Sequence, residues 1–475
     1  MTKANSIMWF RKDLRLKDNP ALHFAAKQGD VLPVFILDTQ TDQNDALGGA
    51  SQWWLHHSLE SLNRDLGGKL LVLKGAPKPL LEKLIDAFDI QVVTWNRCYE
   101  ANSIERDTDI KQHLTKKGLT VKSFNGSLLW EPMQITKQDG SPYKVFTPYY
   151  RKGCLAAPPP RYPEEKPNVT TLDSKGYGLC IEELCLLPDI AWDQGLKETW
   201  QPGEEGAATR LHTFLDGPIL RYKDDRNIPA IRGTSMLGPH FHWGEMSVNQ
   251  AWYATLDKFG GMDKEGVDTF LSELGWREFS YYLLFHNPQL RTKNVASKFD
   301  AFPWREDSSA LKRWQKGQTG IPIVDAGMRE LWQTGYMHNR VRMVVGSFLV
   351  KNLLLDWRLG ERWFWDCLCD ADTASNSASW QWVAGCGADA APYFRVFNPV
   401  LQGEKFDKHG EYVKTYCPEL SALPNKYIHK PWDAPKSVLS EAGVTLGEHY
   451  PKPIVDLKAS RVRALEAFDA VKQAS

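Results

Sequence analysis

The stretch SIMWFRKDLRLKDNPALHFAAKQGDVLPVFIL, residues 6–37, decides the fold class of this chain. It holds two short apolar runs, 6–10 and 31–37, with the length and the β-branched or aromatic content of strands. Helical periodicity separates these runs from three more strand-like segments, which lie at 69–73, 91–95 and 120–124. Alternation of this kind is typical of a parallel sheet covered on both faces. We therefore expect a doubly wound α/β domain over residues 1–130.

After residue 130 the strand–helix rhythm stops. The segment AAPPPRYP, residues 156–163, is too rich in proline for a helix or a central strand, so we interpret residues 131–200 as an interdomain connector. From about residue 205 strand signals nearly vanish, and apolar residues recur at spacings of three and four. We expect an all-helical domain over residues 201–475, with helices that include 267–286, 322–334, 338–355 and 459–472.

The composition describes a globular protein of 475 residues that is large enough for two domains. Lysine plus arginine equals aspartate plus glutamate, 58 against 58, so a nucleic-acid partner would have to bind a local basic patch. Nineteen tryptophans are far more than usual. They indicate either core filling or, for some of them, stacking platforms or an electron path.

No stretch of about 18 apolar residues and no signal peptide is apparent, so we expect an intracellular protein that does not enter a membrane. The eight cysteines form no C-x-x-C pair, which favours free thiols. No H-E-x-x-H motif occurs, and the pair His56 and His57 is interpreted as a surface feature of a helix. We expect no metal site.

Two segments have the character of nucleotide-binding turns. The string G-x-G-x-x-A at 385–390 follows a W-Q-W run in helical sequence, so a turn between helices is favoured over a dinucleotide fingerprint. The segment RGTSMLG, 232–238, resembles a helix N-terminus at which Thr234 and Ser235 would either hold a phosphate or simply cap the helix.

Three further motifs place polar side chains at helical spacing. In E-L-G-W-R, Glu273, Trp276 and Arg277 share one helix face, which suits either an ion-paired surface or a pocket for a hydrogen-bonding ring. In H-N-R-V-R-M, Asn339 and Met343 share a face, and asparagine suits the edge of a base. The third motif, D-A-D-T-A-S-N followed by W-Q-W, suits either a metal or a ribose and heterocycle, and it contains Asp370, Asp372, Asn376, Trp380 and Trp382.

Together these motifs resemble the photolyase/cryptochrome family, and within it the bacterial class I cyclobutane pyrimidine dimer photolyases. The resemblance spans the chain and includes WFRKDLRL at 9–16, YKVFTPY at 143–149, TGIPIVDAGMR at 319–329 and DAAPYFRVFNP at 389–399. It implies a flavoprotein lyase that repairs UV-damaged DNA under blue light. Excited reduced FAD would give one electron to the dimer and receive it back after the cyclobutane bonds break.

The resemblance also implies the residues of each site. Asn376 would face N5 of the flavin, and the family turn usually ends in serine where this chain has Gly238. The FAD-binding residues would be Tyr222, Thr234, Ser235, Met236, Leu237, Gly238, Arg342, Asp370, Asp372 and Asn376. The flipped-out lesion would contact Glu273, Trp276, Asn339, Met343 and Trp382. The DNA strand would contact Arg226, Arg277, Arg340, Arg395, Gln402 and Lys405. Photoreduction would use the tryptophan chain Trp380, Trp357 and Trp304.

The sequence leaves alternatives open for the antenna, for the lesion and for a signalling role. For the antenna, Asn102 is retained but Ser103 follows it, so methenyltetrahydrofolate is expected, with a deazaflavin, FMN or an empty site as alternatives. A (6-4) photolyase would usually carry histidine in place of Asn339 or Met343. A signalling cryptochrome often carries a long C-terminal extension, which this sequence lacks. We expect a monomer in the bacterial cytoplasm, with the nucleoid.

Overall fold

The computed structural model describes residues 3–40, 46–174, 176–390 and 394–473. Its N-terminal part is a five-stranded sheet with the order β3-β2-β1-β4-β5, in which every neighbouring pair is parallel. The strands are β1 (Asn5–Phe10), β2 (Val31–Asp38), β3 (Leu71–Gly75), β4 (Ile90–Asn96) and β5 (Thr120–Phe124). The expected doubly wound sheet is confirmed, with strand ends shifted by at most two residues.

Both faces of this sheet are covered. Alternate residues of a strand face opposite sides, so Met8 and Phe10 join one apolar core while Ile7 and Trp9 join the other. This is why the strands read as continuous apolar runs rather than alternating ones. The covering helices are α1 (Pro20–Gln28), α2 (Gly49–Asp65), α3 (Pro77–Phe88) and α4 (Ala101–Lys116).

The connector packs along the sheet instead of hanging free. Thr171 bridges to Val31 and Leu179 bridges to Val72, so the connector passes over the β2 and β3 strands. The proline-rich segment contains neither helix nor strand, as expected. The short helices of this region are α5 (Phe146–Pro148) and α6 (Gln194–Thr199).

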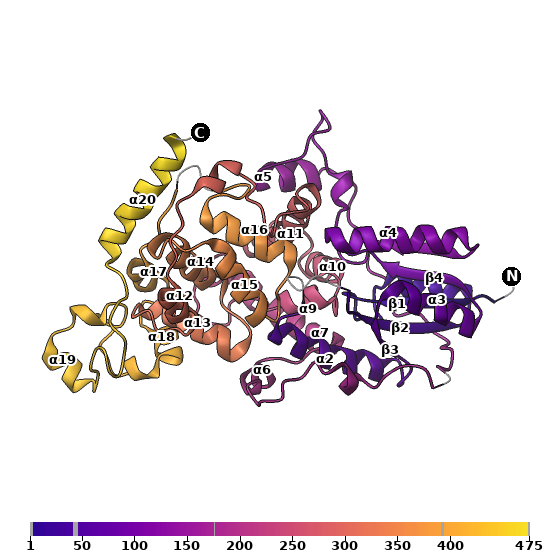
Figure 1. Ribbon diagram of the computed structural model, residues 1–475, viewed down its shortest axis with the longest axis horizontal. Helices are drawn as coiled ribbons and strands as arrows, with labels where there is room; N and C mark the ends of the chain where they lie inside the picture. Colours follow the sequence, from indigo (N-terminus) through magenta and orange to yellow (C-terminus); the bar gives the residue numbers. More distant parts are fainter. Residues whose placement is uncertain (1–2, 41–45, 175, 391–393, 474–475) are drawn as a thin grey trace.

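The rest of the chain is helical, and no helix among the described residues is long and apolar enough to cross a membrane. Figure 1 shows the sheet at one end of the molecule and the helical region at the other, with α9 and α10 between them. The helices are α7 (Glu204–Leu215), α8 (Tyr222–Asp225), α9 (Gly238–Trp243), α10 (Val248–Phe259), α11 (Glu265–His286), α12 (Ser308–Gln315), α13 (Pro322–Thr334), α14 (Asn339–Ser347), α15 (Trp357–Cys367), α16 (Thr373–Ala384), α17 (Pro399–Phe406), α18 (Glu411–Tyr416), α19 (Lys436–Glu441) and α20 (Leu457–Gln473).

The expectation of one continuous helix over 338–355 is wrong. The α14 helix ends at Ser347, a π-helical turn η7 follows over Phe348–Asn352, and Leu354 has a positive φ of 57°. Apolar spacing does not distinguish this wider turn from a regular helix, because both bury the same side chains. The break lets α15 start in a new direction.

A buried carboxyl joins the connector to the helical region and gives a first prediction. Glu278 of α11 accepts the backbone N–H groups of Leu129 (2.8 Å) and Trp130 (3.2 Å). Burial raises the pKa of Glu278 from 4.5 to about 7, although Arg277 and these N–H groups oppose the shift. The folded chain therefore binds more protons than the unfolded chain between these two values. Its free energy of unfolding should fall by roughly 3 kcal/mol as pH rises through that window.

Denaturant titrations at pH 5 and pH 8 check this. Glu278→Gln should show a smaller decline in stability between the two pH values than the parent protein. The exposed Glu306→Gln is the matched control and should decline as the parent does. An undiminished decline in Glu278→Gln would contradict the prediction.

Candidate functional site

The turn before α9 differs from a capped helix N-terminus. The α9 helix begins at Gly238, its N-cap is Leu237, and no side chain makes a capping hydrogen bond. The capping interpretation of Thr234 and Ser235 is therefore wrong, because both precede the helix by three residues or more. Met236 has a positive φ of 52°, which turns the chain sharply here. The hydroxyl-bearing residues thus lie on a turn and are not used by the helix that follows.

The glycine at position 238 has a structural reason. A Cβ built on Gly238 would lie 2.7 Å from Oδ2 of Asp370, closer than side chains tolerate. Asp370 in turn accepts from Nη2 of Arg342 at 3.0 Å, and Arg342 also donates from Nε to the carbonyl of Met337. The carboxylate thus lies where a side chain at position 238 would begin.

Asp370 also offers an unused acceptor. Its Oδ1 is buried and has no hydrogen-bond partner among the described residues. A buried acceptor without a partner is costly, so a ligand hydroxyl or N–H at this point would stabilise the site. FAD carries such donors on its ribityl chain and its ring, so the residues present fit this cofactor.

Asp372 is a fully ionised acceptor in the interior. Its Oδ1 accepts the N–H of Ser375 at 2.7 Å and its Oδ2 accepts the hydroxyl of Tyr281 at 2.5 Å. Burial alone would raise its pKa, but His242, Lys12 and Tyr281 hold it well below the ordinary range. An ionised carboxylate only accepts, which suits a ring N–H of a heterocycle. Sequence reasoning missed both Lys12 and His242 as neighbours of this carboxylate.

Asn376 is oriented by a partner that sequence reasoning missed. It lies on α16, and its Nδ2 donates to the carbonyl (3.1 Å) and to Oε1 (3.0 Å) of Glu361. Nε of Arg291 lies 3.1 Å from the same carboxylate oxygen. With its amide nitrogen committed to Glu361, Asn376 turns its carbonyl oxygen to the other side. That oxygen is an acceptor aimed away from α15.

The side chains expected at the lesion come from α11, α14 and α16, and α16 packs against both of the others. Nη1 of Arg226 donates to Oε1 of Glu273 at 2.6 Å, and the pKa of Glu273 is raised by burial while Arg226 opposes the shift. Trp276 stacks on Phe146 with ring centroids 3.8 Å apart, and Nε1 of Trp382 donates to the carbonyl of Asp389.

The third helix of this group is α14. Asn339 is its exposed first residue and follows the N-cap His338. Asparagine is unfavourable in the middle of a helix, and this position avoids that cost. Met343 is half-buried one turn later and its sulfur lies 3.8 Å from Nη1 of Arg340.

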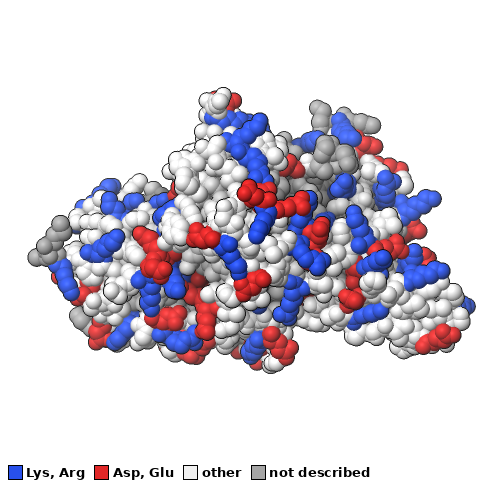
Figure 2. All heavy atoms as spheres, turned by 180° about the vertical axis from the view of Figure 1, so that it is seen from behind, with Lys and Arg blue, Asp and Glu red and all other residues white. Residues whose placement is uncertain are grey.

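Four of the six expected DNA contacts line one groove. The groove has a volume of about 790 Å³ and is lined by Arg340, Arg395, Gln402 and Lys405 among others. Figure 2 shows basic and acidic side chains interspersed over the opposite side of the molecule from Figure 1, as the balanced charge requires. Sequence reasoning missed two further cations of the groove, Lys458 and Arg461 of α20.

The other two expected DNA contacts do not line this groove. Arg226 is paired with Glu273. Arg277 has a side chain that is 14% exposed, donates to the carbonyl of Ser127 and lies over the ring of Tyr281. The assignment of Arg277 to the DNA surface stays a prediction, because its half-buried side chain contacts Ser127 and Tyr281 and does not line the groove. Helical spacing did not reveal that Arg226 pairs with Glu273 or that Arg277 contacts Ser127 and Tyr281.

The three tryptophans of the expected electron path differ in exposure. Trp357 and Trp380 are buried, whereas Trp304 is partly exposed. Trp380 packs so closely on Gly360 that a Cβ there would lie 2.1 Å from the indole. Trp357 donates from Nε1 to Asn294 at 3.0 Å. Trp304 is thus the member of the three that reaches the surface, and the electron path itself stays a prediction.

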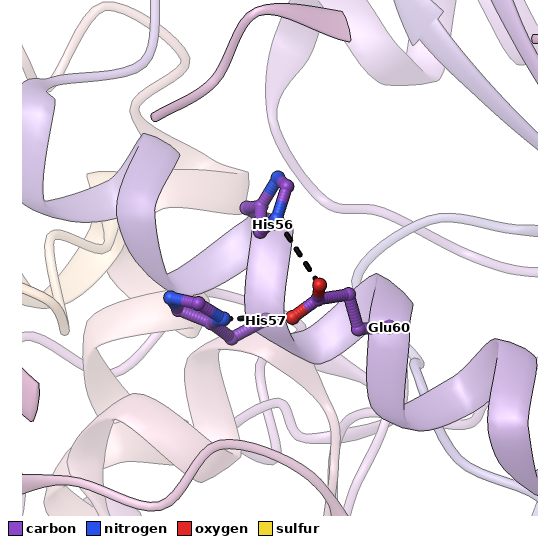
Figure 3. Close-up of side chains that lie close together, drawn as sticks. All are labelled: His56, His57 and Glu60. Carbon is purple, nitrogen blue, oxygen red and sulfur yellow. Dashed lines mark hydrogen bonds and ion pairs between the residues drawn. The ribbon is translucent and has the colours of Figure 1, made fainter. Parts of the chain in front are cut away.

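A second cluster of potential ligands lies on α2 and involves His56, His57 and Glu60. Figure 3 shows both imidazole rings directed at the Glu60 carboxylate, with Nδ1 of His57 at 2.8 Å and Nε2 of His56 at 3.4 Å. His56 is buried, which corrects its interpretation as a surface residue. The other ring nitrogens, Nδ1 of His56 and Nε2 of His57, have no partner among the described residues, whereas metal-ligating imidazoles almost always have one. The trio is therefore interpreted as a turn of α2 in which the carboxylate of Glu60 lies close to both imidazole rings.

The chain matches two family models and several known proteins. The model described as "DNA photolyase" matches residues 6–167, and that described as "FAD binding domain of DNA photolyase" matches 270–470. A deoxyribodipyrimidine photo-lyase of Agrobacterium fabrum is 48% identical over 99% of this chain and 98% of its own length. Cryptochrome-1 of Arabidopsis thaliana is 38% identical over 98% of this chain and 70% of its own length. A crystal structure of a bacterial class III photolyase from Agrobacterium tumefaciens has a TM-score of 0.95 and 48% identity, covering 100% of this chain and 98% of that one.

Proposed function

The chain belongs to the DNA photolyase and cryptochrome family, and from that premise we propose that it repairs cyclobutane pyrimidine dimers in DNA when illuminated. Its helical part is an FAD-binding domain. The observation that carries the proposal is a set of polar acceptors around the start of α16, the helix that also carries Trp382. The set comprises the unpartnered buried Oδ1 of Asp370, the N-cap Asp372 and the buried Asn376. A cofactor and a lesion-contacting ring are thus supported by the same helix.

The relatives refine the subfamily. The class I placement expected from the motifs is not supported, because the solved structure that is 48% identical is described as a class III photolyase. We propose that this chain is a class III photolyase as well. The segment HFHWGE at 240–245 lies at the domain boundary, where Trp54 of α2 donates to Glu245 at 2.9 Å.

Reduced FAD supplies the electron that light transfers to the lesion. Arg342, Asp370 and Asp372 would hold the cofactor, and the side-chain oxygen of Asn376 would accept a hydrogen bond from it. Trp276 and Trp382 stack on the flipped-out bases, and Asn339 binds a base edge. Glu273, whose pKa is raised by burial, hydrogen-bonds a lesion carbonyl. Arg226 fixes the direction of that carboxyl group.

The residue types near the start of α14 support the choice of the cyclobutane dimer over the (6-4) photoproduct. Asn339 and Met343 occupy positions where (6-4) photolyases usually have histidine, so no imidazole is available there as an acid. Repair of a purified cyclobutane thymine dimer and of a (6-4) photoproduct under blue light tests the choice. We expect repair of the first only. Repair of the (6-4) photoproduct alone would refute the assignment.

A light-receptor function without repair is the second candidate, since plant cryptochromes are 38% identical to this chain. The Glu273 and Trp276 arrangement favours repair, because an acidic side chain beside a stacking ring serves a base and not a signalling contact. The same illuminated assay separates the two candidates. Absence of repair by FAD-loaded, reduced protein would favour the receptor.

Gly238→Ser gives a prediction for cofactor binding. The added side chain would start 2.7 Å from Oδ2 of Asp370 and force that carboxylate away from Arg342. Loss of one charge-assisted hydrogen bond should weaken FAD binding by about 1–3 kcal/mol, or roughly 5- to 150-fold in Kd. Titration of apoprotein with FAD, followed by flavin fluorescence, measures this. Gly217→Ser, at an open position, is the control. Equal affinities in both variants would contradict the role given to Asp370.

The antenna is proposed to be a reduced folate, with a flavin or a deazaflavin as alternatives. Asn102 is exposed in the first turn of α4, beside the boundary between the two parts of the chain. Acid extraction of the purified protein and identification of the released chromophores tests this. A second flavin or a deazaflavin in the extract would overturn the folate proposal.

A further inference from the structure

The groove beside the expected lesion site has a second basic wall. Of the described residues that line it, none is acidic and five are cationic, namely Arg340, Arg395, Lys405, Lys458 and Arg461. On a protein with 58 basic and 58 acidic residues, such a concentration of one sign is local. A groove of this kind attracts a polyanion. Lys458 and Arg461 belong to α20, which no motif had connected with DNA.

The first wall of the groove carries Arg340 of α14 and Lys405 of α17, and both cations pack against one aromatic ring. The guanidinium of Arg340 lies 4.4 Å from the ring of Phe406, and the ammonium of Lys405 lies 5.1 Å from the same ring. Arg340 also donates from Nη2 to Asn227. These contacts fix the cations on α14 and α17 in the groove, so little side-chain entropy is lost when a phosphate binds.

The second wall is fixed by the π-helical turn η7. Nδ2 of Asn352 donates to the buried hydroxyl of Ser460 at 2.9 Å, and Arg463 donates to the carbonyl of Asn352 at 2.6 Å. These two bonds set the rotation of α20. Lys458 and Arg461 are three residues apart and share a helix face, which is the face turned to the groove. Figure 1 shows α20 along the outer edge of the helical region, beside α17.

We propose that Lys458 and Arg461 of α20 bind backbone phosphates of the DNA strand that flanks the lesion. This inference rests on the proposed function and extends its DNA surface beyond the residues that the family motifs supply. The groove, at about 790 Å³, is far larger than one phosphate and has cations on both walls. A strand that enters it is therefore held from two sides, by α14 and α17 on one and by α20 on the other. Contacts of this kind position DNA and do not read its sequence.

The test is the salt dependence of DNA binding. The double variant Lys458→Ala/Arg461→Ala should bind a 16-nucleotide strand that contains one thymine dimer more weakly than the parent does. The slope of log K against log salt should become shallower by about 1.5, since each phosphate contact contributes roughly 0.7–0.9. Lys472→Ala is the control on the same helix, because Lys472 is paired with Asp469 and does not line the groove. The control should keep the slope of the parent.

A short ligand separates this inference from the proposed function. A thymine-dimer dinucleotide fills the lesion site but does not reach α20, so parent and double variant should bind it equally. An unchanged slope with the long strand, or equal losses for both ligands, would overturn the inference while leaving repair intact. A parent protein that does not prefer the dimer to undamaged DNA would instead refute the proposed function. Far-ultraviolet circular dichroism before each titration verifies that the exposed substitutions leave the fold unchanged.

Discussion

Trp304→Phe nearly abolishes photoreduction of the oxidised flavin and leaves repair by chemically reduced protein unchanged. Trp304 is the partly exposed end of the series whose other members, Trp357 and Trp380, are buried. Phenylalanine keeps the ring contact with Phe302 but is much harder to oxidise than indole. An electron taken up by the flavin would leave an oxidised tryptophan in the interior, which no surface indole could then reduce, so the charges would recombine.

Two assays check this prediction. The bleaching of oxidised flavin at about neutral pH under blue light, with an external reductant, measures photoreduction. Repair by protein reduced beforehand with dithionite measures catalysis alone. Trp192→Phe, a partly exposed tryptophan of the connector, is the control and should photoreduce normally. Normal photoreduction by Trp304→Phe would remove Trp304 from the path.

Glu273→Ala lowers the repair rate of reduced protein by about 100-fold, the usual cost of removing one preorganised hydrogen-bonding group from a site of developing charge. The variant also leaves Arg226 without its 2.6 Å partner, facing the position of the lesion. FAD binding should be unchanged, because Glu273 makes none of the contacts of the Asp370 and Asp372 cluster.

Glu273→Gln distinguishes a proton from a hydrogen bond. Burial raises the pKa of Glu273, so its protonated form persists to higher pH than for an exposed glutamate. If that proton serves the reaction, repair by the parent declines as pH rises through this pKa, whereas Glu273→Gln is less active and independent of pH. Repair rates measured across pH 5–9 in the parent and both variants decide between a transferred proton and a hydrogen bond. Full activity in Glu273→Ala would contradict the proposed pocket.

The N-terminal sheet could be predicted because short segments of the sequence are enough to identify its strands. A strand that is buried on both faces needs five or more consecutive apolar residues, as at Val31–Asp38, and such runs are visible in the sequence. The helical region was predictable as a class but not in detail. The π turn at Phe348–Asn352 keeps the apolar pattern of a helix, so spacing did not reveal it.

The site was predictable where motifs carry it and not where distant residues complete it. Asp370, Asp372 and Asn376 stood out as a polar run before a W-Q-W sequence. Their partners Tyr281 and Glu361 come from other helices, and no spacing rule connects residues that are 15 or 91 positions apart. The same reason explains Arg277, whose partner Ser127 lies 150 residues away. Helical spacing identifies a shared face, but packing alone decides whether that face meets solvent.

We infer that a flavin bound in this protein would pass an electron directly to a dimer held by α11, α14 and α16. The excited-state lifetime of the reduced flavin, measured in the loaded protein with thymine-dimer DNA and with undamaged DNA of the same sequence, tests it most directly. We predict a shorter lifetime with the dimer, because electron transfer to it adds a decay route, and a matching loss of dimers. Identical lifetimes with the two DNAs, at concentrations where both are bound, would contradict the account.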